Sequence, residues 1–405
     1  MQLTSVLATI TGRDRPGVTA AFMSALAAHD VDIRDVEQVV VRERLILAVL
    51  LDLHGDATAL RNSVRHTASA LGMECEVAVA DIAEPHDRSG RAGRSHVTVL
   101  GRPLRPGALS HVAQSIADIG DNIESVTQLS NEPVSAIDMI VRTADPVLLR
   151  STLVQAAEES GVDIAVEGAG LRRRAKRLVV LDVDSTLIQD EAIDVLAKHA
   201  GVTDEVSRIT ERAMSGELDF AASLRSRVAL LAGLTRAQVE AVRDELVLTP
   251  GARTFVRTLR RLGYQVGVVS GGFTVFTDRF VAELGLDFAA ANELEIVEDL
   301  VTGRVLGAIV DRAGKAEALR RFAAAFAVPM SQTVAVGDGA NDIDMLEAAG
   351  LGIAFNARAA LRAAADTSVN LPFLDSVLFV LGISREEIDE ADGEGRLDFP
   401  DPPPT

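Results

Sequence analysis

The sequence has one cysteine, one tyrosine and no tryptophan among its 405 residues. The single cysteine, Cys75, excludes an intramolecular disulfide and favours a reducing compartment. We interpret Cys75 as a small buried hydrophobic residue of a strand, not as a nucleophile. The first residues lack the basic segment and apolar stretch of a signal peptide, so a cytoplasmic location is expected. No apolar run is long enough to span a bilayer, and the longest, residues 45–53, predicts a core strand.

Positive charge is also scarce, with 40 Lys and Arg residues against 59 Asp and Glu residues and a formal net charge of −19. Such a field repels phosphate polymers and anionic lipid, so neither nucleic acid nor a membrane is an expected partner. We therefore interpret the basic stretch at residues 172–177 as the solvated edge of a linker. Hydrophobic residues at 48% and charged residues at 24% are typical of a folded protein, and the length predicts two or three domains.

A repeat with a spacing of about ninety residues occupies the first part of the chain. Residues 12–17, Gly-Arg-Asp-Arg-Pro-Gly, recur in altered form at residues 101–107, Gly-Arg-Pro-Leu-Arg-Pro-Gly. The order strand, helix, strand, strand, helix, strand is predicted for each copy, in the first at about residues 3–11, 17–28, 32–41, 45–53, 57–71 and 74–79. This order is the ferredoxin-like βαββαβ unit. We expect domains at residues 1–82 and 95–170, joined by a linker at residues 83–94 that is rich in glycine, proline and charge.

From residue 176 onward, continuous apolar strands alternate with helical stretches. Such strands are typical of a parallel sheet buried on both faces, and they lie at residues 178–181, 265–269, 333–336 and 351–354. The pattern predicts a doubly wound, Rossmann-like α/β domain at residues 176–383. Residues 191–248 have only helical spacing, which predicts an inserted helical cap. Residues 384–405 are acidic and end in a proline run, so most of this tail is expected to be disordered.

Two acidic residues, Asp182 and Asp184, follow the first of these strands in the stretch Asp-Val-Asp-Ser-Thr. Ligands of open α/β sheets lie beyond the carboxyl ends of the strands, where both carboxylates emerge. Two anions this close repel each other, which suggests a bound Mg²⁺ or a shared proton between them. A helix N-cap by Asp184 or Ser185 is the structural alternative. His199, the only histidine of this half, lacks partners at metal spacing and is interpreted as a surface or packing residue.

Three further polar features follow. Ser270-Gly271-Gly272 ends another predicted strand and offers a hydroxyl and backbone N–H groups to an anion. Lys315, one of only three lysines, suits a point contact with one phosphate oxygen. Asp338, Asn341 and Asp342 follow a third strand, and hard oxygen ligands of this kind suit Mg²⁺. Each feature alone also fits a turn, a surface residue or an N-cap, but together they predict one phosphate-handling site.

The acidic pair and the three polar features, taken in their order along the chain, resemble the four motifs of the haloacid dehalogenase superfamily. Over about residues 178–381, the resemblance is to the branch that hydrolyses O-phospho-L-serine in the last step of serine biosynthesis. It implies that Asp182 attacks phosphorus and forms an aspartyl phosphate. Asp184 would protonate the leaving serine oxygen and then deprotonate the hydrolytic water. Mg²⁺ would be held by Asp182, Asp338 and the backbone carbonyl of Asp184.

The same resemblance implies the groups around the phosphoryl oxygens. These are Ser270, the N–H of Gly271, Lys315 and Asn341, which would stabilise the charge that grows in the transition state. Asp342 would orient Lys315 or a metal-bound water.

For the amino acid part of the substrate, the resemblance implies binding of the carboxylate by Arg227 and of the ammonium group by Glu191. Met214 and Phe220 would close the cap over the substrate and exclude water. Two alternatives stay open. One is a phosphatase or phosphotransferase of the same superfamily that acts on another small phosphomonoester, and the other is a non-catalytic amino acid sensor.

The N-terminal repeat resembles ACT domains, which are ferredoxin-like modules that often bind amino acids. The resemblance implies an amino acid effector, for which the product serine is the natural candidate, and exposed sheet edges favour a homodimer. The ligand loop would include Gly12, Asp14, Pro16 and Gly17, where Gly17 lets the backbone approach a carboxylate at a helix N-terminus. Purely structural packing of the two domains is the alternative.

Overall fold

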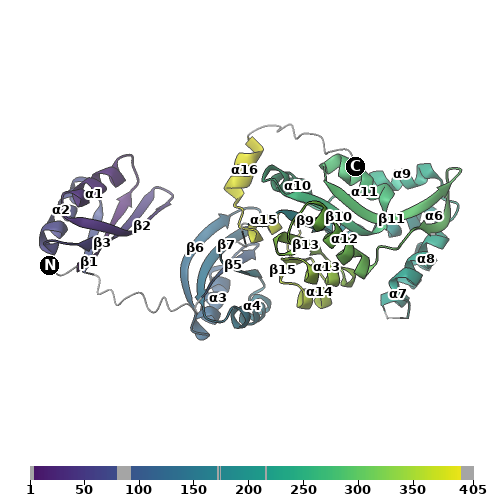
Figure 1. The fold of residues 1–405 in the computed structure, drawn as a ribbon, viewed down its shortest axis with the longest axis horizontal. Helices are drawn as coiled ribbons and strands as arrows, with labels where there is room; N and C mark the ends of the chain where they lie inside the picture. The colour runs from purple at the N-terminus through teal and green to yellow at the C-terminus, as the bar shows by residue number, and fades with distance from the viewer. Residues whose placement is uncertain (1–3, 80–92, 171–172, 174, 215–216, 394–405) are drawn as a thin grey trace. The chain divides into compact units, whose positions relative to one another are not determined.

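The structure is a computed structural model that describes residues 4–79, 93–170, 173, 175–214 and 217–393 (Figure 1). The chain divides into two compact units, Met1–Gly90 and Arg91–Thr405. Among the described residues, no helix has the length and apolar character needed to cross a membrane.

The first unit contains a four-stranded antiparallel sheet, ordered β2-β3-β1-β4, and two helices. Its elements are β1 (Thr4–Arg13), α1 (Val18–Ala27), β2 (Val31–Val41), β3 (Arg44–Leu53), α2 (Ala57–Ala70) and β4 (Glu74–Val79). Every second residue of β3 is buried, because one face of the sheet shares a core with Phe22 of α1 and Leu60 of α2. Cys75 of β4 is partly buried against this core, and burial raises the pKa of its thiol. The predicted βαββαβ order is confirmed.

The second unit begins with the second copy of this fold. It consists of β5 (Gly93–Gly101), α3 (Pro106–Asp118), β6 (Asn122–Ser130), β7 (Ser135–Thr143), α4 (Pro146–Ser160) and β8 (Asp163–Gly168), with the sheet order β6-β7-β5-β8. The linker predicted at residues 83–94 is wrong for its last two residues, because Gly93 and Arg94 pair with Thr143 and Arg142 of β7. Backbone pairing does not depend on the side chains from which the linker was inferred. The rest of that linker lies outside the described residues.

The larger part of the second unit is built around a seven-stranded sheet, ordered β12-β11-β10-β9-β13-β14-β15. Its strands are β9 (Leu178–Leu181), β10 (Gln265–Phe273), β11 (Phe288–Val297), β12 (Leu300–Leu306), β13 (Thr333–Gly337), β14 (Gly352–Phe355) and β15 (Thr367–Val369). All neighbours are parallel except β11 and β12, which are antiparallel. The predicted Rossmann-like sheet is confirmed. The structure adds strands β11, β12 and β15 to those predicted. The sequence pattern does not indicate β12 and β15, because they are edge strands with polar residues, or β11, because it is rich in Ala and Glu.

Helices cover both faces of this sheet (Figure 1). Val179 and Leu181 of β9 belong to one core and the alternate residues of the strand to another, because successive side chains point to opposite faces. The first core is completed by α10 (Ala252–Arg261), α11 (Thr274–Leu284) and α15 (Ser376–Val380). The second is completed by α12 (Arg312–Ala325), α13 (Ile343–Ala348) and α14 (Ala359–Ala364).

The inserted segment consists of α6 (Ala192–Ala200), α7 (Thr203–Met214), α8 (Phe220–Leu230) and α9 (Arg236–Glu245), as the helical spacing predicts. Thr235 is the N-cap residue of α9 and forms a capping box with Gln238. Its hydroxyl accepts from the Gln238 N–H, and the Gln238 side chain accepts from the Thr235 N–H. The chain enters and leaves the cap beside an antiparallel bridge between Ile188 and Leu248. This bridge ties the two ends of the cap to each other.

The start of the C-terminal tail, residues 384–393, is structured, so the disorder predicted for most of residues 384–405 does not include this part. Helix α16 (Arg385–Gly393) lies within it. Ile388 is fully buried in the core that also contains α10 and α15, and Arg385 pairs with Asp375 at 3.1 Å. A single apolar anchor can dock a helix whose average composition is polar. Residues 394–405 lie outside the described part of the chain.

The prediction of a solvated edge at residues 172–177 is wrong for Arg173 and Lys176, which are buried, whereas Arg177 is exposed and residues 172 and 174 lie outside the described residues. Arg173 pairs with Asp138 of β7 at 3.1 Å and with Glu167 of β8 at 3.3 Å, and it donates to a carbonyl of α15. Lys176 donates to two backbone carbonyls of the sheet domain. These side chains connect the second ferredoxin-like copy to the sheet domain. The sequence shows the charges of such a run but not their distant partners.

Candidate active site

Three strand ends meet at the centre of the seven-stranded sheet. Strand β9 lies between β10 and β13 and runs parallel to both. Residues that follow these strands therefore gather at one edge of the sheet. Asp182 follows β9, Ser270 lies near the end of β10, and Asp338 follows β13. The structure brings together groups that are far apart in the sequence.

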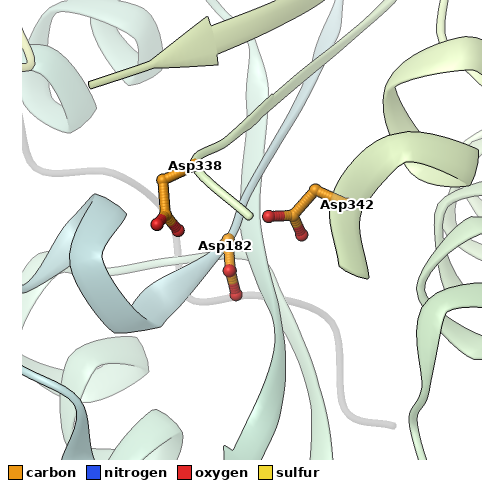
Figure 2. Close-up of side chains that lie close together, drawn as sticks. All are labelled: Asp182, Asp338 and Asp342. Atoms are coloured by element: carbon orange, nitrogen blue, oxygen red, sulfur yellow. The ribbon is translucent and has the colours of Figure 1, made fainter. Parts of the chain in front are cut away.

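The acidic residues Asp182, Asp338 and Asp342 each offer a carboxylate oxygen, and these oxygens lie within 4.8 Å of one another (Figure 2). Burial raises the pKa of Asp182 well above its ordinary value, and the Asp342 carboxylate raises it further. Burial and the same neighbour raise the pKa of Asp338 to about 6. A nearby cation relieves such repulsion. Hard carboxylate oxygens in this arrangement fit a divalent cation such as Mg²⁺.

Lys315 is a fully buried cation beside this cluster. Its Nζ atom lies 2.7 Å from Asp182 Oδ1 and 2.7 Å from Asp342 Oδ1. Burial alone would lower the pKa of Lys315, but the two carboxylates raise it above its ordinary value, so the ammonium group stays charged. Asp311 accepts from the Gly314 N–H and caps α12, which places Lys315 in the first turn of that helix.

Asp184 reaches the same region from the turn Val183–Leu187, in which Ser185 has a φ of 55°. Its carboxylate accepts from the Ala192 N–H at 2.8 Å and from the Ser270 hydroxyl at 3.1 Å. Burial raises the pKa of Asp184. The N-cap alternative is met in part, because one oxygen of Asp184 binds the first N–H of α6. The other oxygen remains in the polar site.

The loop Ser270-Gly271-Gly272 is packed tightly under the cap. The buried Ser270 hydroxyl accepts from the Gly272 N–H at 2.7 Å. A Cβ atom at Gly271 would lie 2.9 Å from the ring of Phe220, the first residue of α8. Glycine at this position therefore allows the cap to approach the loop, and Phe220 lies directly against it.

The loop after β13 folds back on itself in a similar way. The Gly339 N–H donates to Asp342 Oδ2 at 3.1 Å, and Asn341 Oδ1 turns back over Gly339. A Cβ atom at Gly337 would lie 2.5 Å from the carboxyl carbon of Asp342. Only glycine at Gly337 lets Asp342 approach Lys315 from this side.

Two charged residues of the cap region, Glu191 and Arg227, lie near Asp184. Glu191 accepts from the Ser185 hydroxyl at 3.1 Å. Burial of the carboxyl group and the negative charge of Asp184 raise the pKa of Glu191 to about 7. Part of the Glu191 side chain is nevertheless exposed to solvent. Burial lowers the pKa of Arg227, whose Nε is buried without a hydrogen-bond partner in the described part of the chain. That donor fits an anionic group of a ligand. The side chain of Met214 lies outside the described residues.

Asn292 of β11 is a residue that the sequence does not mark. Its buried side chain donates to the Gly271 carbonyl at 2.8 Å and so contacts the glycine loop from the neighbouring strand β11. No signal singles it out, because β11 is not among the predicted strands and an isolated asparagine fits any turn.

The candidate effector loop lies between β1 and α1 in the first unit, where Asp14, Pro16 and Gly17 are exposed. Gly17 has a φ of 94°, in the left-handed region that favours glycine. Gly12 lies in β1, and the Asp14 N–H donates to the Glu43 carbonyl at 2.8 Å. The loop is therefore anchored at its start and open to solvent.

Models of known protein families match the same three domains of the chain. A family model described as haloacid dehalogenase-like hydrolase matches residues 176–350, and two ACT domain models match residues 4–78 and 94–167. A phosphoserine phosphatase of Streptomyces coelicolor is 56% identical over 96% of this chain and 94% of its own length. One of Mycobacterium tuberculosis is 51% identical over 98% of each chain. The solved structure of a probable phosphoserine phosphatase from Vibrio cholerae has a TM-score of 0.58 and 35% identity, and the match covers 74% of this chain and 89% of that one.

The chain therefore belongs to the haloacid dehalogenase-like hydrolase family, with two N-terminal ACT domains. It is an enzyme, and the relatives that it matches over nearly its full length are named phosphoserine phosphatases. The family resemblance predicted from the sequence motifs is confirmed.

Proposed function

We propose that this enzyme catalyses the Mg²⁺-dependent hydrolysis of O-phospho-L-serine to L-serine and phosphate, the last step of serine biosynthesis. The observation that carries the proposal is the position of Asp182. Its carboxylate lies 2.7 Å from Lys315 Nζ and within the acidic cluster, and Asp184 lies close enough to raise the pKa of Asp182. The names of relatives with 51% and 56% identity over nearly the full length support the substrate.

Asp182 is the nucleophile in this mechanism. One carboxylate oxygen attacks phosphorus, the bond from phosphorus to the serine oxygen breaks, and an aspartyl phosphate forms. Lys315, the Ser270 hydroxyl, the Gly271 N–H and the Asn341 amide stabilise the phosphoryl oxygens as their negative charge grows. The 2.7 Å contact between Lys315 and Asp182 supports this arrangement, because it places a fixed positive charge beside the attacking group.

Asp184 is the general acid and base. It donates a proton to the serine oxygen as the P–O bond breaks, and it then accepts a proton from the water that hydrolyses the aspartyl phosphate. Burial raises the pKa of Asp184, which favours the protonated form that the first step needs. The Ala192 N–H and the Ser270 hydroxyl hold the carboxylate in place.

Asp182, Asp338 and the backbone carbonyl of Asp184 are the groups that we propose to hold Mg²⁺. The raised pKa values of Asp182 and Asp338 support a cation at this position. When bound, the ion supplies positive charge to the phosphoryl group. Asp342 belongs to the acidic cluster, but its two oxygens already accept from Lys315 Nζ and the Gly339 N–H, so its role is to orient Lys315.

The cap selects the amino acid part of the substrate. Arg227 binds the carboxylate, and its buried Nε, which has no hydrogen-bond partner among the residues that the structure describes, supports this role. Glu191 in its ionised form binds the ammonium group. Phe220 packs against Gly271 and, with Met214, closes the site against water.

We further propose that the ACT domains, at residues 1–82 and 95–170, regulate the cytoplasmic enzyme and form a homodimer. In the first unit, the sheet face away from the helices exposes Leu7, Val39 and Ile46, and apolar faces of this kind favour association. Serine would bind the loop around Gly17, where the N-terminus of α1 can receive a carboxylate.

Phosphate release by the purified chain tests the proposed reaction. O-phospho-L-serine, phosphoethanolamine and glycerol phosphate are compared with Mg²⁺, with EDTA, and after Mg²⁺ is restored. We expect phosphoserine to react about ten times faster or more, and EDTA to stop the reaction reversibly. Equal rates on all three esters would indicate another small phosphomonoester as substrate. No release from any ester would indicate an amino acid sensor without catalysis.

A further inference from the structure

The pairing of β10 with β11 is interrupted at the glycine loop. Val269 pairs with Ala290, and the next pair is Phe273 with Asn292. Between these pairs, β10 contains the three residues 270–272, whereas β11 contains one. The extra residues bulge out of the ladder, so their backbone groups need other partners.

Asn292 supplies one of these partners. Its Nδ2 donates to the Gly271 carbonyl at 2.8 Å, and its Oδ1 accepts from the Val310 N–H at 2.8 Å. The side chain is only 1% exposed, so it is shielded from bulk water that would compete for these bonds. Because both ends of the amide are used, its orientation is fixed. Val310 directly precedes Asp311, the N-cap of α12, so one side chain connects the glycine loop to the start of the Lys315 helix.

The bond to Gly271 sets the direction of a whole peptide plane. The Gly271 carbonyl and the Gly272 N–H belong to one planar trans peptide and point in opposite directions. With the carbonyl held by Asn292, the N–H points to Ser270 Oγ at 2.7 Å. The Ser270 hydroxyl in turn donates to Asp184 Oδ2 at 3.1 Å. A continuous chain of hydrogen bonds therefore runs from Asn292 to Asp184.

We propose that Asn292 is a positioning residue that acts through the Gly271–Gly272 peptide and Ser270. It holds Ser270 Oγ in place, so that the single hydroxyl proton is donated to Asp184 in this structure and can turn to a phosphoryl oxygen when the substrate binds. Without it, the peptide can rotate and the hydroxyl loses its fixed donor. Displacements of about 1 Å at a reacting site can cost about a hundredfold in rate. This inference rests on the proposed phosphatase function.

Two variants separate positioning from simple packing. Asn292→Leu has nearly the same size and branching and fills the same space, but it makes neither hydrogen bond. Asn292→Ala removes both bonds. Asn370→Ala is a control, because the Asn370 amide also donates a hydrogen bond within the protein, to the Asp163 carboxylate, but at an exposed position directly after the edge strand β15.

We expect both Asn292 variants to lower kcat for phosphoserine about 10- to 100-fold, with KM within about threefold of the parent. The control should keep the parental kcat. Hydrogen exchange should be faster in the peptide containing residues 270–273, whereas exchange in β13 should stay unchanged. A packing role predicts instead that Asn292→Leu keeps the parental kcat, and that result would overturn the proposal. If Asn292→Ala does not fold, Asn292→Leu carries the test.

A double variant tests the route through Ser270. If Asn292 acts through this hydroxyl, adding Asn292→Ala to Ser270→Ala should cause less than about a threefold further loss of kcat. Independent, multiplicative losses would contradict the proposal. The activity of the parent enzyme distinguishes failure of the positioning role from failure of the proposed phosphatase function. An active parent with unaffected Asn292 variants removes only the positioning role, whereas a parent inactive on every phosphate ester removes both proposals. If another ester is the substrate, the same kcat comparison is made with that ester.

Discussion

Lys315 Nζ lies 2.7 Å from Asp182 Oδ1, and both side chains are buried at the carboxyl end of the central strand. The pair joins the residue that follows β9 to the first turn of α12, while Asp342 holds the same ammonium group from the other side. In the proposed mechanism, this cation faces the phosphoryl group at the moment when charge develops.

Replacing Lys315 by Met should reduce kcat about 10²- to 10³-fold, because a donor to the phosphoryl oxygens is lost in a water-poor site. The free energy of unfolding should fall by about 3–5 kcal/mol, since two buried carboxylates lose their cation. Lys315→Arg should not rescue activity, because a planar guanidinium needs more room than an ammonium group. Steady-state kinetics and urea unfolding measure both effects. Lys198→Met, on the exposed side of α6, is the control, and more than a tenth of the parental kcat in Lys315→Met would refute the role.

Asp182→Asn should abolish turnover, since an amide neither attacks phosphorus nor binds Mg²⁺ comparably. The pKa of Asp182 is higher in the folded than in the unfolded chain, so the ionised carboxylate destabilises the fold above about pH 4. Without divalent cations, the melting temperature of Asp182→Asn should therefore not fall below that of the parent. Asp184→Asn should lose about 10²- to 10⁴-fold in kcat while it still binds Mg²⁺ through its carbonyl. Calorimetric Mg²⁺ titration and single-turnover phosphate release distinguish the two variants. Near-parental kcat in either variant would contradict the assigned roles.

Arg227→Ala should selectively impair the use of phosphoserine. Loss of charge-assisted hydrogen bonds to the substrate carboxylate costs about 1.5–3 kcal/mol, or roughly ten- to a hundredfold in kcat/KM. Phosphoethanolamine has no carboxylate, so it should be a poor substrate of the parent and nearly insensitive to the substitution. Arg225→Ala, an exposed position on the same helix, is the matched control. Equal losses with both esters would show that Arg227 is structural.

The preference for an ammonium group should depend on pH through Glu191. Its pKa is raised to about 7, so the carboxyl group is neutral below that pH and negative above it. The ratio of kcat/KM for phosphoserine to that for 3-phosphoglycerate, which has a hydroxyl in place of the ammonium group, should therefore rise as pH increases through about 7. The midpoint should shift lower with Mg²⁺ bound, because added positive charge favours the carboxylate. Glu191→Gln should make the ratio flat, and an unchanged rise in that variant would exclude Glu191.

Serine binding to the first ACT domain can be separated from product binding at the catalytic site. Arg227→Ala weakens the catalytic site, so calorimetric titration of this variant with serine should report the effector loop. Adding Gly17→Val should remove the remaining binding, because the φ of 94° at this position strains a β-branched residue. Sedimentation should show a dimer. Serine binding that survives in the double variant would place the effector elsewhere, and no binding in Arg227→Ala would leave the repeat a structural or assembly module.

Much of the site could be predicted from the sequence because its residues follow apolar strands. Asp182, Ser270 and Asp338 each stand next to a strongly hydrophobic stretch, and parallel strands bring their carboxyl ends to one edge. Asn292 gave no such signal, since its importance depends on a bulge in the neighbouring strand. The N–H of Ala192 as a partner of Asp184 was equally hidden, because every residue except proline carries that group.

The sequence by itself determined the two ferredoxin-like copies, the Rossmann-like sheet, the helical cap and the order of the four motifs, because these depend on local periodicity and short spacing. Only the tertiary structure decided which charges are buried and paired. Arg173 belongs to a run that composition marks as solvated, yet it is enclosed by Asp138 and Glu167. Ile388 similarly anchors a helix in a tail expected to be mostly disordered. The physical reason is the same in both cases: burial depends on partners from distant segments, and a local pattern does not contain those partners.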